Sequence, residues 1–399
     1  MAATTGVQAG FEANQTQLSY GVEAAYGVAP ASTFQAIRYN SENLKGAKTR
    51  TRPNEIRGDR QMSGAITTQE TAGGTISAAL SYGTFDDLIS SLLGSDWQAP
   101  TTVQGAAGDV ALNAVGAQLT STTSGKFSAV KPGSWIKLSG FTNAANNTFL
   151  RVVAKPDNQT LTVAGGVGLV TETPAGTAAK VTFSNIANGT QAKTLFLQQR
   201  FSSSGFLRYP GSYVTRMQLA AQIGQFLSGS FDILASQELK GSSDASTGGI
   251  LPAPVGAVHN PVAGIKGIYF LEALFGTSVD QCSFDLTNDG AAQQFALGSS
   301  LGIGQLLGTF MSSASFRAYF RDFAQYDAAK SETAGAFAMH TADAAGNRYV
   351  LTIPNATLVN PQVDAGGVGQ AVMATFTVEA NPDPVSGATL LIDRFAATA

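Results

Sequence analysis

One pattern of strand-like segments occurs twice in this chain of 399 residues, and it constrains the fold more than any other feature. Pro210 stands 21 positions before Phe231, and Pro354 stands 22 positions before Phe376. In both places a Gly-Gln pair precedes the phenylalanine by seven positions, and apolar and polar residues alternate around it, which predicts β-strands. A chain that carries one β unit twice is more typical of an assembly protein than of an enzyme.

The similarity extends upstream of these segments. Gly74–Leu80 resembles Ala314–Phe320, and each run is followed by an aromatic-aspartate pair, Phe85-Asp86 in the first copy and Tyr326-Asp327 in the second. We therefore expect each copy to contain a strand, a short helix and long antiparallel hairpins. The alternative is chance similarity between alternating strands, which are common.

The first of the two helices is predicted over Phe85–Leu93. Its apolar residues recur at the spacing of one helix face. Thr84 is a suitable N-cap, Asp86 and Asp87 fall in the first turn where the helix dipole favours acids, and Gly94 can end the helix.

The composition is unusual for a soluble protein. Apolar residues make up 44% of the chain, but charged residues make up only 13%, about half the usual fraction, and there are 44 glycines. This favours a chain that buries much of its surface in an assembly, although an extracellular β protein has a similar profile. The net charge of −3 gives no general basic field for holding nucleic acid.

The sequence offers no support for an enzyme or a cofactor. The single Cys282 excludes an internal disulfide framework and a cysteine-based zinc site, and it is predicted to be a buried strand residue. His259 and His340 have no partners at metal-ligand spacing, so we expect both to be structural, and no known catalytic or nucleotide-binding motif is present. We predict no catalytic, cofactor or metal site.

Neither a secretion signal nor a membrane segment is visible. The first residues lack a basic region and an apolar stretch, and no apolar run approaches the roughly 18 residues of a membrane span. We therefore expect synthesis in the cytoplasm and no membrane insertion.

Regular alternation fails over Lys45–Gln61, which predicts a long structureless and functional loop. The second copy has a loop at the matching place, Asn288–Gly308, but that loop is rich in glycine and almost uncharged. The basic loop can be a solvated surface, a contact with acids of a neighbouring subunit, or a phosphate-binding segment. Its candidate contact residues are Lys45, Lys48, Arg50, Arg52, Arg57 and Arg60.

An insertion interrupts the first copy at residues 101–182. Five strand-like runs separated by turn signals predict a small all-β domain. We therefore expect a mainly β chain of three parts: a first domain at 1–100 and 183–245, the insert at 101–182, and a second domain at 246–399. Trp135 and Phe141 of the insert are candidates for stacking on a sugar, but a small β domain more often uses such a tryptophan in its core.

Several segments together resemble the tail tube, or major tail, protein of long-tailed bacteriophages. The resemblance covers most of the chain outside the insert and rests on short motifs: Glu23–Pro30, Arg60-Gln61, Gly73–Ser77, Phe206–Gly211, Gly229–Phe231, Thr341–Asn347 and Asp364–Gly367. It implies a β-sandwich with a flanking helix and a long loop that reaches the neighbouring ring. Six such units form each ring, and the stacked rings make a hollow tube for DNA in the virion tail.

The resemblance also implies partners. A chain with two units would need three copies per ring, and the tube would meet the tape measure, tail terminator and distal tail proteins while double-stranded DNA passes without specific binding. The two loops differ in charge, so the six unit positions of such a ring would alternate in chemistry and would not be equivalent. The insert is expected on the tube exterior, since loop tips tolerate insertions.

A second hypothesis comes from a different class. The chain can be a surface adhesin whose insert binds glycans through Trp135 and Phe141. Hollow tubes or three-fold rings in electron microscopy would favour the tail tube, and a monomer that binds cell envelope would favour the adhesin.

Overall fold

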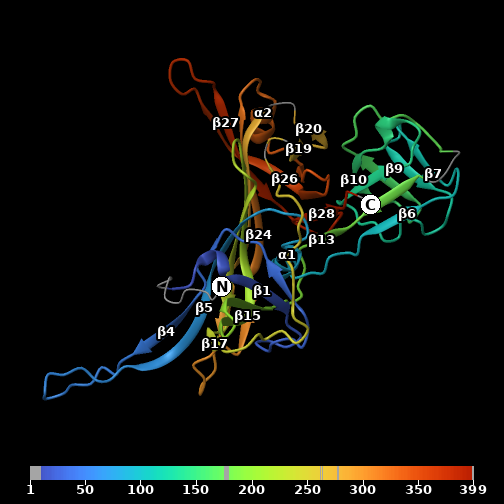
Figure 1. The fold of residues 1–399 in the computed structure, drawn as a ribbon. Helices are drawn as coiled ribbons and strands as arrows, with labels where there is room; N and C mark the ends of the chain where they lie inside the picture. Colours follow the sequence, from blue (N-terminus) through green and yellow to red (C-terminus); the bar gives the residue numbers. More distant parts are fainter. Residues whose placement is uncertain (1–9, 175–178, 261, 263, 276–277, 398–399) are drawn as a thin grey trace, which may run out of the picture.

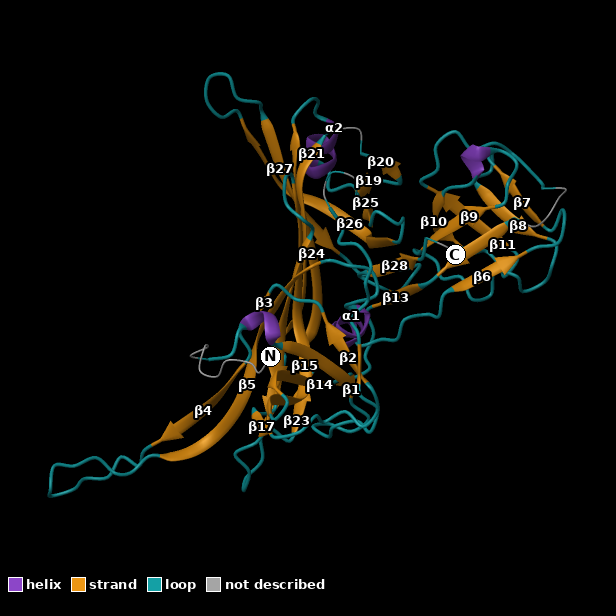
Figure 2. Ribbon diagram, in the orientation of Figure 1, coloured by secondary structure: helices purple, strands orange, loops and turns teal. Residues whose placement is uncertain are grey.

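A computed structural model describes residues 10–174, 179–260, 262, 264–275 and 278–397 of the chain, and these residues are mainly β (Figures 1 and 2). Backbone pairing links 19 strands into one extended network, and seven other strands form a separate sheet. The predicted mainly β fold with short helices is confirmed.

The first part of the network is formed by strands from the first 251 residues of the chain, and we call it the first β unit. Its elements are β1 (Gln17–Val22), β2 (Phe34–Ile37), β3 (Ser41–Glu42), β4 (Lys45–Thr51), β5 (Ile66–Ala79), α1 (Asp86–Leu93), β14 (Leu195–Ser202), β15 (Gly205–Gln222), β16 (Ser228–Ala235), β17 (Leu239–Gly241) and β18 (Ile250–Leu251). Strand β18 runs parallel to β2, so the chain stays against the first unit beyond residue 245.

The second β unit follows. Its elements are β19 (Ile265–Phe270), β20 (Ala273–Leu274), β21 (Val279–Asp289), β22 (Ala292–Gln294), β23 (Gly304–Leu306), β24 (Thr309–Tyr319), α2 (Ala324–Lys330), β25 (Ala334–Ala342), β26 (Arg348–Asp364), β27 (Met373–Ala380) and β28 (Leu391–Phe395). The short strand β13 (Asn185–Ala187) pairs with β28 and connects the insert to both units.

The two units pair their strands in the same way. In the first unit β5 pairs with β16 and β16 with β15, and in the second β24 pairs with β27 and β27 with β26. The register also agrees, since Ile76 lies opposite Phe231 and Phe316 lies opposite Phe376. Each α-helix packs against the corresponding long strand, α1 on β15 and α2 on β26.

The units are joined edge to edge. Seven residues of β15, from Arg216 to Gln222, pair with β21 in antiparallel register. One continuous sheet therefore runs through both units in the order β4, β5, β16, β15, β21, β24, β27, β26, and it forms the long axis of the molecule in Figure 1.

Helix α1 lies almost where the sequence predicts it. Leu88, Ile89, Leu92 and Leu93 are buried, and Gly94 ends the helix in the left-handed conformation, with φ 58°. The predicted N-cap is wrong: Phe85 holds that position. The Thr84 hydroxyl instead shares a hydrogen bond of 2.7 Å with that of Ser81, so it is not available to the helix N-terminus.

The insert is a distinct all-β body, as expected, and its seven strands form one sheet. These are β6 (Thr101–Gln104), β7 (Val110–Asn113), β8 (Gln118–Ser121), β9 (Trp135–Ser139), β10 (Phe149–Ala154), β11 (Thr160–Ala164) and β12 (Lys180–Phe183). The first two were not predicted, because they are short and follow no clear turn signal. The insert has its own buried apolar cluster, and it lies beside the second unit in Figure 1.

A polar cluster also ties the second unit to α1. The Asp86 carboxylate accepts hydrogen bonds from Tyr349 Oη and Arg394 of the second unit, and the Arg394 guanidinium lies 4.5 Å from the centre of the Trp97 ring. Burial raises the pKa of Asp86 above its usual value, although Arg394 and Tyr349 act in the opposite direction. The helix and the second unit are thus held together by a largely buried ion pair.

We expect Arg394→Ala to lower the free energy of unfolding by roughly 3 kcal/mol, because it leaves the Asp86 carboxylate buried without its cation. Urea unfolding of the unassembled chain measures this. Arg321→Ala is the matched control, since Arg321 is exposed. Adding Asp86→Asn to Arg394→Ala should restore part of the loss. Equal stability of the Arg394 and Arg321 variants would show that the ion pair does not stabilise the fold.

Candidate functional site

The continuous sheet has two chemically different faces. One face carries the apolar residues that pack against the core, including Met217, Phe231, Phe284, Phe316 and Phe376. The alternate positions, which point the other way, carry mainly small polar side chains. These are Thr75, Ser77, Gln218, Ser230, Ser283, Asp285, Thr287, Ser313, Ser315, Thr375 and Thr377.

Charges on this polar face are mostly paired or hydrogen-bonded. Arg216 of β15 donates two hydrogen bonds to Asp285 of β21, one of 2.8 Å from Nε to Oδ1, across the junction between the units. These hydrogen bonds hold the pKa of Asp285 below its usual value. Arg317 likewise donates to Asp280, at 2.7 Å from a terminal guanidinium nitrogen. The result is a broad hydrophilic face that carries little unbalanced charge.

The predicted basic loop is an extended arm. The interpretation of Lys45–Gln61 as structureless is wrong for its first part, because β4 pairs with β5 along Lys45–Thr51. Every residue of β4 is exposed, so neither face of this hairpin needs apolar residues, and the sequence shows no alternation there. Figure 1 shows the arm reaching far beyond the rest of the molecule.

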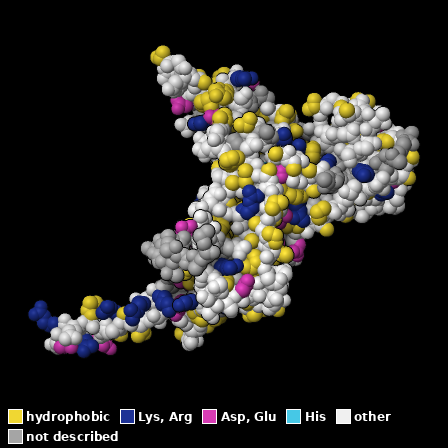
Figure 3. All heavy atoms as spheres, viewed as in Figure 1, with side chains coloured by type: hydrophobic (Ala, Val, Ile, Leu, Met, Phe, Trp, Pro, Cys, Tyr) yellow, Lys and Arg dark blue, Asp and Glu magenta, His cyan; other side chains and the backbone are white. Residues whose placement is uncertain are grey.

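The six predicted basic residues all lie on this arm, and dark blue side chains follow its whole length in Figure 3. Lys48 pairs with Glu70 at 3.1 Å, and Arg57 pairs with Asp59 at 3.0 Å. Arg50 and Arg52 donate to backbone carbonyl groups across the hairpin, at 2.8 and 3.2 Å. These contacts stiffen the arm, while Lys45 lies at its base and Arg60 near its tip.

Exposed apolar side chains stand among these charges. Ile56 is fully exposed, and Met62 and Ile66 are exposed by 76% and 63%. The arm is therefore amphipathic, and a surface of this kind is typical of a segment that contacts another molecule. The matching connection of the second unit, residues 290–308, instead contains the small sheet of β22 and β23.

The two candidate sugar-binding aromatics have no free ring face. Phe141 is 5% exposed and belongs to the apolar cluster of the insert. Trp135 is 1% exposed and lies between the insert and the second unit, where its Nε1 donates to Thr352 Oγ1 at 3.1 Å. Its ring also packs edge-on against His340, with 4.1 Å between ring centres.

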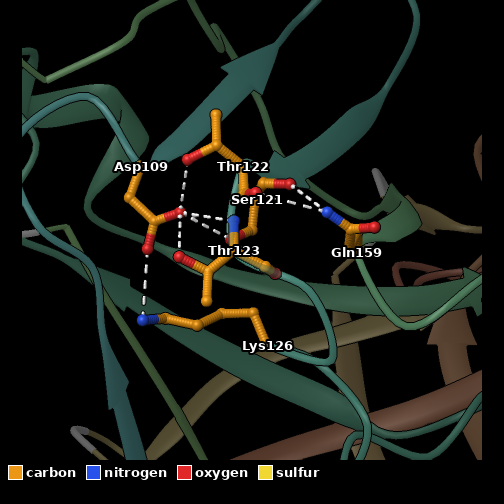
Figure 4. A network of polar contacts seen from close by, with 6 residues as sticks. All are labelled: Asp109, Ser121, Thr122, Thr123, Lys126 and Gln159. Atoms are coloured by element: carbon orange, nitrogen blue, oxygen red, sulfur yellow. Dashed lines mark hydrogen bonds and ion pairs between the residues drawn. The ribbon is translucent and has the colours of Figure 1, made fainter.

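Polar residues of the insert form one compact network, drawn in Figure 4. Asp109 Oδ1 accepts from Ser121 Oγ at 2.7 Å, from Thr122 Oγ1 at 2.9 Å and from the backbone N–H of Thr123 at 3.0 Å. Lys126 Nζ lies 3.1 Å from the other carboxylate oxygen. Burial raises the pKa of Asp109, but these donors lower it by more than burial raises it. The pKa therefore lies below its usual value. The network joins neighbouring turns of the insert.

The remaining candidates for chemistry are buried. His259 Nδ1 lies 3.0 Å from Thr341 Oγ1, and burial lowers the pKa of His259 to about 4. Cys282 is buried in β21, as predicted. Among the described residues, no three His, Cys, Asp or Glu side chains gather closely enough to hold a metal ion. In the same part of the chain, no helix has the length and apolar character needed to cross a membrane.

The surfaces that stand out are therefore a hydrophilic sheet face and an amphipathic arm, both suited to assembly. No curated protein matches the chain. The family model for phage tail tube proteins matches residues 13–380, which spans both β units and the insert. The chain therefore belongs to the phage tail tube protein family.

Proposed function

We propose that this chain is the structural subunit of a phage tail tube and that it polymerises into stacked rings around a channel for DNA. The observation that carries this proposal is the continuous sheet built from two similarly paired β units. A sheet with open edges pairs readily with further strands, and closure into a ring removes those edges.

The polar sheet face is the surface that we assign to the channel. It is opposite the apolar face that the helices and core cover, and it is rich in Ser and Thr with balanced charges. Such a face stays hydrated and holds no dense array of cations, so it lets DNA pass without binding it tightly. The sequence alone does not indicate which residues face the channel.

Each chain supplies two repeated units under this proposal, so three chains complete a ring of six. The shared pairing register of β5–β16 and β24–β27 supports the domain duplication. Self-association is the main interaction under this proposal, and the family match supports a place in the virion tail. The proposal adds the tape measure, tail terminator and distal tail proteins as further partners, and synthesis in the host cytoplasm.

Electron microscopy of the purified chain tests this directly. We expect hollow tubes or rings whose averaged projections have three-fold symmetry with a weaker six-fold component. Strict six-fold rings of six chains would contradict the three-chain ring, and a stable monomer at high concentration would contradict the tube.

The arm is proposed to contact the neighbouring ring. Replacing Arg50, Arg52 and Arg57 by Glu should leave rings intact but prevent their stacking, because six units of charge change at an exposed amphipathic contact. Lys180, Lys240 and Lys266, all exposed and outside the arm, give a matched control when changed to Glu. Sedimentation and negative-stain images separate rings from tubes. Full-length tubes from the arm variant would exclude this role.

The insert is proposed to lie outside the tube and to brace the second unit. Its first and last strands bring Thr101 opposite Phe183, so a short linker can replace residues 101–182. We expect the deleted chain to assemble but to melt at a lower temperature, because Trp135 no longer covers Ala338, Val350 and Phe395.

Trp135→Ala in the full chain is the control for that deletion. It should reproduce part of the loss in melting temperature, with tubes of normal diameter in electron micrographs. A deleted chain that folds yet fails to form rings would show that the insert belongs to the ring contact.

A further inference from the structure

We propose that a second copy of this chain adds its strand β4 to the free edge of β26, in the register that places Lys45 opposite Gln362. This inference rests on the proposed tube function and specifies how neighbouring chains join. An equivalent contact exists within the chain itself, at the junction of β15 and β21.

The relevant edge of β15 is occupied along its length. Strand β14 pairs with β15 up to Ser212, and β21 takes over on the same edge from Arg216. The corresponding edge of β26 is paired with β25 only up to Thr357. Among the described residues, no strand continues along that edge from Leu358 to Asp364, although β27 pairs with the opposite edge. Apart from Pro361, which has no N–H, its backbone groups are therefore open to a partner strand.

Strand β4 offers the other half of the contact. It pairs with β5 on one edge, and all its residues are exposed. The Gly46 N–H donates to Glu238 Oε2 at 2.9 Å, a side-chain contact that the incoming strand would replace. The counterpart of β4 in the second unit is β21, whose second edge is covered by β15. In the first unit, β4 thus lacks a strand on the edge that corresponds to the paired edge of β21. In the second unit, β26 lacks a strand on the edge that corresponds to the paired edge of β15.

Burial at equivalent positions supports the pairing. Leu219 of β15 lies opposite Phe284 of β21, and both side chains are 1% exposed. The equivalent of Leu219 in β26 is Val363, which is 40% exposed. An incoming β4 would place Leu44 opposite Val363 and cover this apolar side chain, as the internal junction covers Leu219.

The register on the β26 side follows from the neighbouring strands. Gln218 lies opposite Ser230, one residue before Phe231, and Gln362 lies opposite Thr375, one residue before Phe376. Each long strand also carries one extra residue shortly before this point, so the equivalence of Gln218 with Gln362 holds through the irregularity.

The register on the β4 side follows in the same way. Asp285 lies opposite Ser313, three residues before Phe316, and Lys45 lies opposite Gly73, three residues before Ile76. Within the chain Gln218 lies opposite Asp285. The equivalent pair between chains is therefore Gln362 and Lys45.

The charges at the two junctions differ in a consistent manner. The internal junction is held by Arg216 of β15 and Asp285 of β21. Between chains the base is Lys45 on β4, and the acid is Asp364, two residues beyond Gln362 on the same face of β26. Opposite charges therefore stand across both junctions, with the signs exchanged.

Engineered cysteines test this register. Cys282 is the only native cysteine and is buried, so it does not compete. We expect Gln362→Cys with Lys45→Cys to yield disulfide-linked chains in assembled tubes, seen as a ladder on non-reducing gels. Gln218→Cys with Asp285→Cys is the matched control, because it occupies the equivalent pair and should form a disulfide within one chain without raising its mass.

An out-of-register pair completes the design. Gln362→Cys with Thr49→Cys should cross-link at least about tenfold less, since its Cα atoms would lie beyond the reach of a disulfide. Equal cross-linking of the two Gln362 pairs would overturn the register. Normal tubes without the Lys45 disulfide, when the internal control closes, would overturn it too and leave the proposed function standing. Failure of the unmodified chain to assemble would overturn both.

Discussion

The backbone pairing of β15 with β21 is the interaction on which the rest of this structure depends. Through these seven residue pairs, two β units that each have their own helix and hairpins become one continuous sheet. The pairing places the apolar sides of both units on one face and their Ser and Thr residues on the other. The Arg216–Asp285 contact adds to it, but both side chains are partly exposed, so the backbone ladder and the buried Leu219–Phe284 pair contribute more.

Much of this architecture is readable from the sequence because it rests on local patterns. Alternation predicts the long strands, and the equal spacing from Gly-Gln to Phe231 and to Phe376 indicates that they pair alike. Helix α1 is predicted to within one residue, since its apolar spacing and Gly94 are strong signals. Strand β4 is missed because a hairpin exposed on both faces requires no apolar period.

The candidate surfaces are less predictable, because they depend on contacts between distant segments. The basic composition of the arm is visible in the sequence, but its rigid, extended shape comes from pairing with β5. For Trp135 the sequence favours a core position over a ligand platform, but only its contacts with Thr352 and His340 show that it packs against the second unit. The sequence shows the polar face of the sheet as polar residues at alternate positions, such as Ser313 and Ser315. Which way this face points in the molecule can be assigned only once the core is located.

The covalent link between the units has a thermodynamic consequence. A junction inside one chain forms at the effective concentration set by the connecting segment, which does not change when the protein is diluted. A junction between chains obeys mass action and weakens as subunits become scarce. In a ring of the proposed kind, half of the junctions would therefore be insensitive to dilution, and a dissolving tube would release pieces that keep β15 and β21 together rather than single β units.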